Sequence, residues 1–377
     1  MKMKRVFALV CALALLAPVC AFAEGGTIKL GGIAPLSGST AQYGNAVREG
    51  VDLFIEEINA AGGVNGQQVE IIWEDTKGDA LEATNAFNKL VENDGVSAIV
   101  GPVLSGESLA VAPLAGDAGI PMITPSSTSY EVTTGRPSVF RSCFLDPFQA
   151  RSMANYANTQ GMKKVAVLYD NSDDYAVGLA NEFKAQAEKN GQEVVAFEAG
   201  TAKDVDFRSQ LTNIMAAGPE ALFVAFYYEP AAMILTQSIE VGLDCKFLGA
   251  DGIGGVEGLV SDTALLGKMY YCAHFANDAD NENVKAFIES YKAKYGAEPK
   301  MAFSATGYDA AKILVNAIAE AGSTDYAAVV EKIKATNLDC VTGHITFDDH
   351  NDPIKSAYIM NYVDGQPKNV DMVHPEG

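Results

Sequence analysis

The residues best suited to hold a small charged molecule follow short apolar runs of the sequence. Ser105 follows "AIVGPVL", the stretch "PSSTS" follows "PMIT", and Asp251 follows "FLGA". Hydroxyl groups and the free N–H groups of a helix N-terminus bind a carboxylate, whereas a carboxylate side chain binds an ammonium group. These residue types together predict a binding site for a small zwitterion. Its carboxylate would meet Ser105 and the serine-rich loop, and its ammonium group would meet Asp251 and an oxygen of residues 126–128.

Aromatic side chains at related positions would enclose an apolar part of such a molecule. We expect this of Tyr43, Tyr175, Tyr227 and Phe303. Each candidate also has an ordinary structural interpretation, because tyrosines near strand ends are often core residues and an aspartate before glycine often only forms a turn.

The sequence contains no recognisable catalytic motif. The four histidines, His274, His344, His350 and His374, form no helical i,i+4 pair and no HExxH motif, and we interpret them as surface or strand-end residues. The glycines of "GADGIGGVEG" miss the GxGxxG spacing, and neither GxxxxGK[ST] nor GxSxG occurs. The acidic stretch "DDHNDP" lacks the glycine and the distant glutamate of a calcium-binding EF-hand, so it predicts a solvated turn. We therefore predict a binding protein with no catalytic residues, metal or cofactor.

The first 23 residues have the pattern of a cleaved export signal. Basic residues at positions 2, 4 and 5 precede an apolar run and then the small-x-small pattern Ala21-Phe22-Ala23, after which we place cleavage. An uncleaved membrane anchor is the competing interpretation, which Pro18 and the cleavage pattern disfavour. A lipid-modified Cys20 is disfavoured because Pro18 and Val19 precede it. We expect a periplasmic location.

The mature chain would be strongly acidic and would keep four cysteines. Cleavage leaves 354 residues with 24 Lys and Arg against 48 Asp and Glu, a formal charge of −24 that repels nucleic acid and anionic lipid. In an oxidising compartment the remaining cysteines favour one or two disulfides of unresolved connectivity, and buried free thiols are the alternative. These cysteines are Cys143, Cys245, Cys272 and Cys340.

Strands and helices alternate in two successive series. "TIKLGGIA", "QQVEIIWED", "VSAIVG" and "PMIT" are predicted strands separated by amphipathic helices, and the alternation restarts at "KKVAVLYD". This β-α-β pattern predicts two α/β units, each with a parallel sheet. Such sheets bind ligands beyond the carboxyl ends of their strands, which is where the candidate residues lie.

The mature chain resembles the periplasmic leucine/isoleucine/valine-binding proteins, the type I, two-lobed solute receptors of ABC importers. The resemblance rests on "IKLGGIAPLSGSTAQYG", "GVDLFIEEINAAGGVNG", "AIVGPVLSGES", "PMITPSSTS", "YAVGLANEF", "DFRSQLTNI" and "FLGADGIGG". It implies a three-crossover hinge near Asp146, Phe275 and residues 351–354. Lobe 1 would comprise residues 24–146 and 275–353, and lobe 2 residues 147–274 and 354–377.

The resemblance also implies roles for individual residues. Ser105 and Thr128 match positions that hold the ligand carboxylate. Ser126 matches a position whose backbone carbonyl accepts from the ammonium group, and Ser127 lies between Ser126 and Thr128. Asp251 matches the acid that neutralises the ammonium group. Tyr175 and Tyr227 match aromatic residues of lobe 2 that close on the ligand. Tyr43 and Phe303 match walls of the side-chain pocket, and Leu104, which precedes Ser105, is expected to line that pocket too.

Three departures affect the expected ligand. Asp251 stands where glutamate is common, Ala176 where glycine is usual, and Tyr43 where tryptophan is frequent. The expected ligand is an aliphatic or branched-chain amino acid, delivered by a monomer to a membrane permease after the lobes close on it. A sensor subunit for an amide, an aromatic acid or another amino-acid-like solute is the alternative, and a secreted hydrolase would require turnover.

Overall fold

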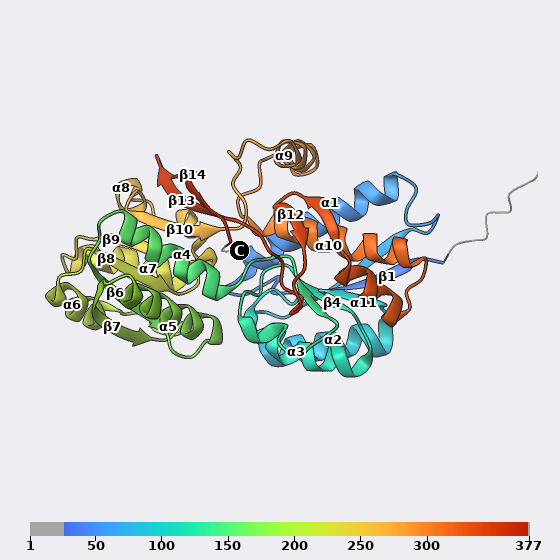
Figure 1. The fold of residues 1–377 in the computed structure, drawn as a ribbon, viewed down its shortest axis with the longest axis horizontal. Helices are drawn as coiled ribbons and strands as arrows, with labels where there is room; N and C mark the ends of the chain where they lie inside the picture. The colour runs from blue at the N-terminus through green and yellow to red at the C-terminus, as the bar shows by residue number, and fades with distance from the viewer. Residues whose placement is uncertain (1–25, 376–377) are drawn as a thin grey trace, which may run out of the picture.

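Two α/β lobes lie side by side in the computed structural model, which describes residues 26–375 (Figure 1). The first lobe is built on a five-stranded sheet of order β2-β1-β3-β4-β5, and the second on a seven-stranded sheet of order β14-β13-β10-β9-β8-β6-β7. A separate two-stranded ribbon pairs β11 with β12. The predicted two-lobed α/β class is confirmed, and the predicted signal peptide lies outside the described residues.

The strands are β1 (Ile28–Ala34), β2 (Val69–Asp75), β3 (Ala98–Val100), β4 (Met122–Thr124), β5 (Val139–Arg141), β6 (Lys164–Asp170), β7 (Glu193–Gly200), β8 (Ala221–Ala225), β9 (Lys246–Gly249), β10 (Met269–Ala273), β11 (Asn337–Cys340), β12 (Gly343–Thr346), β13 (Ala357–Val363) and β14 (Gln366–Val373). The α-helices are α1 (Ala41–Ala60), α2 (Ala80–Lys89), α3 (Ser105–Ala118), α4 (Asp146–Thr159), α5 (Asp174–Lys189), α6 (Arg208–Ala217), α7 (Tyr228–Glu240), α8 (Thr263–Leu266), α9 (Glu282–Tyr295), α10 (Phe303–Ala321) and α11 (Tyr326–Lys334).

Parallel pairing dominates both sheets, and antiparallel strands occur only at one edge of the second. Strands β1 to β5 pair in parallel, as do β6 to β10. Strand β13 pairs antiparallel to β10, and β14 antiparallel to β13. Figure 1 shows β13 and β14 extending over the second lobe, although the chain enters them from the first lobe. The sequence analysis did not predict β14.

Helices cover both faces of each sheet and bury its apolar side chains. In the first lobe α2 and α3 cover one face, while α1 and α10 cover the other. The contact between α1 and α10 is close at Gly50, where an added Cβ would lie 1.8 Å from the carbonyl oxygen of Ser304. No helix among residues 26–375 is both long and apolar enough to cross a membrane.

A buried ion pair joins the end of β5 to the segment that leads back into the second lobe. Arg141 Nε lies 2.6 Å from Asp352 Oδ1, and both side chains are almost fully buried. Asn351 is also buried and donates to the carbonyl oxygen of Val139. The stretch "DDHNDP" is therefore not simply the solvated turn that we predicted, because its second half packs against the first lobe.

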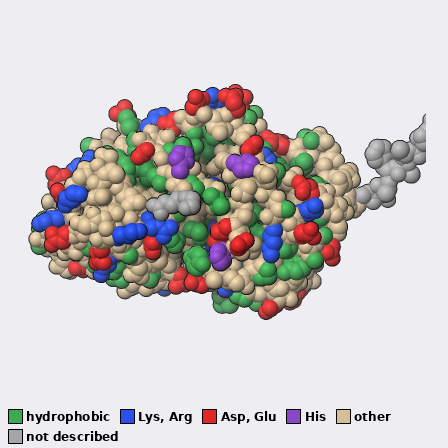
Figure 2. All heavy atoms as spheres, viewed as in Figure 1, with side chains coloured by type: hydrophobic (Ala, Val, Ile, Leu, Met, Phe, Trp, Pro, Cys, Tyr) green, Lys and Arg blue, Asp and Glu red, His purple; other side chains and the backbone are tan. Residues whose placement is uncertain are grey.

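The four cysteines that follow the predicted signal are buried free thiols. Cys143 follows β5, Cys245 precedes β9, Cys272 lies within β10 and Cys340 ends β11. The expectation of disulfides is therefore wrong, and the alternative of buried free thiols is confirmed for all four residues. Cys143 instead donates to the carbonyl oxygen of Ser127. Charged side chains are scattered over the face of both lobes in Figure 2.

Candidate functional site

A pocket of about 240 Å³ lies between the lobes. The first lobe contributes residues that follow β3 and β4 together with side chains of α1 and α10, and the second contributes residues that follow β6, β8 and β9. Eight of the ten residues predicted from the sequence line this pocket. They are Tyr43, Leu104, Ser105, Ser126, Tyr175, Tyr227, Asp251 and Phe303.

The start of α3 presents polar groups to the pocket. Ser105 is the first residue of the helix, and its hydroxyl accepts a hydrogen bond from the backbone N–H of Ser129 at 3.3 Å. The N–H groups of a first helical turn have no partner within the helix, so they attract negative charge. Glu107 closes the turn by accepting from the N–H of Leu104 and the hydroxyl of Thr76. Burial raises the pKa of Glu107 to about 7.

The serine-rich loop contributes Ser126 to the pocket wall, but not Ser127 or Thr128. The hydroxyl of Ser126 donates to the carbonyl oxygen of Val103 at 2.7 Å. Ser127 Oγ lies 2.7 Å from Ser108 Oγ, because the loop packs its hydroxyl onto α3 rather than toward the cleft. The hydroxyl of Thr128 is fully buried and lies beside the carboxyl group of Asp146, on whose pKa it has a lowering effect.

Asp251 occupies the opposite side of the pocket in a dense set of hydrogen bonds. Its Oδ1 accepts from the hydroxyl of Tyr175 at 2.8 Å, the side-chain amide of Gln149 at 3.0 Å and the N–H of Gly252 at 3.0 Å. Its Oδ2 lies 2.9 Å from His274 Nε2. Each carboxylate oxygen has two acceptor positions, so Oδ2, which has one partner, keeps capacity for one further donor.

Four aromatic rings form the apolar wall between these polar groups. Tyr175 and Tyr227 are stacked with ring centroids 5.0 Å apart. Tyr43 packs edge to face against Tyr227 and Phe303, with ring centroids 5.6 and 5.2 Å apart. The stacked pair fits closely against Gly252, where an added Cβ would lie 2.7 Å from the hydroxyl oxygen of Tyr175.

Tyr43 also joins the two lobes. It lies on α1 of the first lobe, and its hydroxyl donates to the carbonyl oxygen of Gly252 at 2.6 Å. The same hydroxyl accepts from the N–H of Tyr228 at 3.0 Å. Both partners belong to the second lobe, so these two bonds exist only while the lobes are together.

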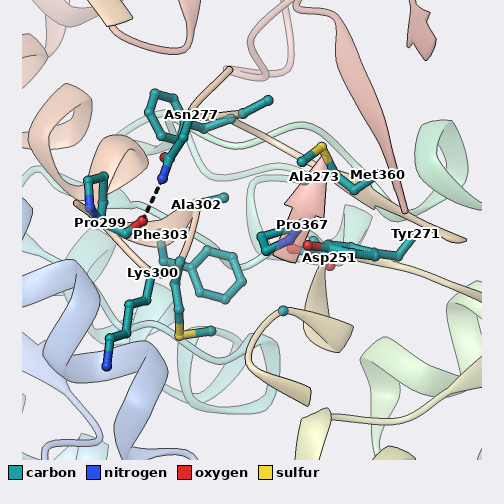
Figure 3. Close-up of a pocket in the computed structure, with 14 residues that line it drawn as sticks. Asp251, Tyr271, Ala273, Asn277, Pro299, Lys300, Ala302, Phe303, Met360 and Pro367 are labelled. Carbon is teal, nitrogen blue, oxygen red and sulfur yellow. Dashed lines mark hydrogen bonds between the residues drawn. The ribbon is translucent and has the colours of Figure 1, made fainter. Parts of the chain in front are cut away.

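A second chamber adjoins the pocket and shares Asp251 and Phe303 with it. Its volume is about 510 Å³. Figure 3 shows Tyr271, Met360 and Pro367 of the second lobe facing Pro299 and Phe303 of the first across this space. Asn277 donates to the carbonyl oxygen of Pro299, which closes one side.

Two residues of the Asp251 network, His274 and Gln149, were not predicted as site residues. His274 was interpreted as a surface or strand-end residue; it does follow β10, but it is fully buried. The strand-end rule, applied to β10, would have identified it. Gln149 lies within α4, and no sequence pattern marks it.

The relatives of this chain are binding proteins. A family model described as periplasmic binding protein matches residues 27–367. The chain is 35% identical over 332 residues to the leucine-, isoleucine-, valine-, threonine- and alanine-binding protein of Pseudomonas aeruginosa, which covers 86% of this chain and 87% of that protein.

Two solved structures share the fold. The branched-chain amino acid transporter substrate-binding protein LivJ of Streptococcus pneumoniae, in complex with isoleucine, is 34% identical with a TM-score of 0.87, covering 93% of this chain and 100% of that chain. The leucine-binding protein LivK of Thermotoga maritima is 35% identical with a TM-score of 0.87, covering 92% and 99%. This chain therefore belongs to the periplasmic binding protein family.

Proposed function

We propose that this protein captures an α-amino acid with an aliphatic side chain between its lobes and delivers it to the membrane permease of an ABC importer. The observation that carries the proposal is the pocket that brings Asp251 of the second lobe opposite Ser105 and Ser126 of the first. A zwitterion needs an anion-binding group and a cation-binding group at opposite ends, and this pocket offers both.

The carboxylate would be held by the first lobe. In our proposal it accepts from Ser105, from the first N–H groups of α3 and, as the family resemblance implies, from the hydroxyl of Thr128, which is buried beside Asp146. Ser127 lies beside Thr128 in the same loop and supports its position through the contact with α3.

The ammonium group would be held from both sides. Oδ2 of Asp251 has acceptor capacity left, and the carbonyl oxygen of Ser126 is the acceptor proposed in the first lobe. The apolar side chain would lie against Tyr43, Leu104, Tyr227 and Phe303. The apolar character of these side chains suits an aliphatic chain, and the ligands named for the relatives are of this class.

Lobe closure would couple capture to delivery. We propose that the chain crosses between the lobes near Asp146, near Phe275 and at residues 351–354, with the lobe boundaries predicted from the sequence. The first lobe would receive the ligand, and the bonds of Tyr43 together with Asp251 would stabilise the closed form. We further propose export with cleavage after Ala23 and action as a monomer.

The ligand can be identified without prior assumption. The mature protein is purified, denatured and extracted, and the released molecules are identified by mass spectrometry. After refolding, calorimetry is performed with leucine, isoleucine, valine, alanine and phenylalanine, and with benzoate as a carboxylate that lacks the ammonium group. We expect binding of an aliphatic amino acid and no binding of benzoate. Absence of binding by every amino acid at millimolar concentration would refute the proposed ligand class.

A further inference from the structure

The carboxylate of Asp251 is paired with a second buried titratable group, His274. The two side chains are 6% and 0% exposed, and His274 Nε2 lies 2.9 Å from Asp251 Oδ2. An ionised carboxylate only accepts hydrogen bonds, so a neutral His274 carries its proton on Nε2. His274 thus contacts the same oxygen that has capacity left for a ligand.

The other ring nitrogen of His274 has no partner. Nδ1 is buried and forms no hydrogen bond within residues 26–375. The ring lies against Phe144, with centroids 3.7 Å apart, and Phe303 is 6.0 Å away on another side. A second proton on this ring would therefore have no acceptor at Nδ1, and its charge would be balanced only through Nε2 and Asp251.

The remaining charged groups around the pair belong to other elements. Lys355, which precedes β13, is buried, and its positive charge acts against protonation of His274. Asp146 at the start of α4 shares the amide of Gln149 with Asp251, at 2.8 and 3.0 Å. Tyr175 on α5 donates to Asp251 and carries no charge at neutral pH. Asp251 is therefore the acid in direct contact with His274.

Proton occupancy on His274 changes what the pair offers to a cation. A neutral His274 leaves the pair with one negative charge, which attracts an ammonium group. A protonated His274 forms a neutral pair with Asp251 and adds a positive charge next to the position of the ligand. The proton and the ligand ammonium group would then compete for one carboxylate.

We propose that His274 is a positioning residue whose protonation state sets the charge that Asp251 presents to the ligand, so that the protein binds its solute at neutral pH and releases it on acidification. This inference rests on the proposed function, since it assumes an ammonium group at Asp251. Burial lowers the pKa of His274, while its hydrogen bond to Asp251 acts in the opposite direction. The transition is therefore expected below the ordinary histidine pKa of about 6.5.

The test is calorimetry of leucine binding between pH 5 and pH 8 on the wild type and on His274→Gln. The glutamine amide can donate to Asp251 from the position of Nε2 but does not titrate. We expect the wild-type Kd to rise about fivefold or more from pH 7.5 to pH 5, with proton release on binding when buffers of different ionisation enthalpy are compared. His274→Gln should lose most of this dependence while still binding at pH 7.5.

The matched control is His344→Gln, because His344 also pairs with an aspartate, Asp339 at 2.7 Å, but is exposed. It should keep the wild-type pH profile. A wild-type Kd that is constant over the range, or a profile unchanged in His274→Gln, overturns the inference while leaving the proposed function intact. Absence of amino-acid binding at pH 8 would instead refute the proposed function. If His274→Gln does not fold, nuclear magnetic resonance of the His274 ring in the wild type decides the question, since Glu107 and Asp146 have pKa values of about 7 and about 8 and contribute to net proton release. A ring titration that the ligand does not shift overturns the inference.

Discussion

The two polar ends of the pocket are built in opposite ways. The first-lobe end uses neutral hydroxyls and the start of α3, whose first N–H groups have no partner within the helix. The second-lobe end uses a carboxylate whose Oδ1 already accepts three hydrogen bonds from the protein. The first end has spare hydrogen-bonding capacity, whereas the second has fixed charge.

This difference has an energetic meaning. A buried carboxylate is costly unless hydrogen bonds compensate its desolvation, and the three bonds to Oδ1 supply that compensation before any ligand arrives. Neutral hydroxyls are less costly to leave exposed in an open cleft. We infer that the first lobe suits initial capture and the second suits the closed state.

The largest expected effect is at the charged end. Asp251→Ala removes the charged partner of the ammonium group and should weaken leucine binding by about 2 to 4 kcal/mol, measured by calorimetry at pH 7.5. Asp349→Ala removes an exposed carboxylate and serves as the control, with no expected change in Kd. An unchanged affinity in Asp251→Ala would remove this residue from the site.

The neutral end contains one buried acid, Glu107, whose effect should appear in stability. Its pKa is raised to about 7 by burial, so between pH 4.5 and 7 the folded state binds more protons than the unfolded state, and stability falls as pH rises. Relative to low pH, the loss should approach roughly 3 kcal/mol above pH 7. Urea unfolding of the wild type and Glu107→Gln at pH 5 and pH 8 measures it: the wild type should lose more stability than the variant. Equal losses in both proteins would contradict the prediction.

Within the first lobe, Ser105 is proposed to bind the ligand through its side chain and Ser126 through its backbone carbonyl, so alanine substitutions at the two positions should affect affinity differently. Ser105→Ala should weaken binding by about 1.5 kcal/mol, because it removes a hydrogen bond to a charged carboxylate. Ser126→Ala should have little effect, since its proposed contribution is the backbone carbonyl and its hydroxyl already donates to Val103. Calorimetry on both variants tests this ordering, and a larger loss in Ser126→Ala would reverse the proposed roles.

The smallest effect on ligand binding is expected from Tyr43, whose hydroxyl joins the two lobes. Tyr43→Phe keeps the ring but removes the bonds to Gly252 and Tyr228, so the closed form should lose about 0.5 to 1 kcal/mol. Small-angle scattering should show a larger radius of gyration without ligand, and Kd should rise slightly. Tyr308→Phe removes a tyrosine hydroxyl bond to Glu57 within the first lobe and should change neither quantity.

Much of this arrangement could be predicted because parallel sheets place their strand ends at one edge. That rule identified Ser105, residues 126–128, Tyr175, residues 227–228 and Asp251. Ser105, Ser126, Tyr175, Tyr227 and Asp251 line one pocket, whereas Ser127, Thr128 and Tyr228 do not. Tyr43 and Phe303 lie on helices, so the strand-end rule does not identify them. They were expected as aromatic walls, and the resemblance to a family assigned them to the side-chain pocket.

The remaining features depend on contacts between distant segments. Gln149 is one polar residue in a helix, and only the tertiary fold brings its amide 3.0 Å from Asp251. Strand β14 has a polar composition that does not alternate as a half-buried strand would, because it lies at the exposed edge of its sheet. Disulfides were wrongly expected, because the number of cysteines and the compartment of the protein do not determine how close the thiols lie to one another in the fold.

The buried thiols provide the protein with built-in reporters of its own motion. Burial raises the pKa of Cys143 and Cys245 to about 12 and that of Cys272 and Cys340 further, so almost no reactive thiolate exists in the folded state. Alkylation must then wait for local opening. Cys143 and Cys272 lie close to two of the proposed lobe crossings, Cys245 precedes a strand of the second lobe, and Cys340 ends the ribbon next to α10. The rate at which each thiol is modified, with and without ligand, would therefore map which parts of the molecule open and which stay shut, with no label added to the sequence.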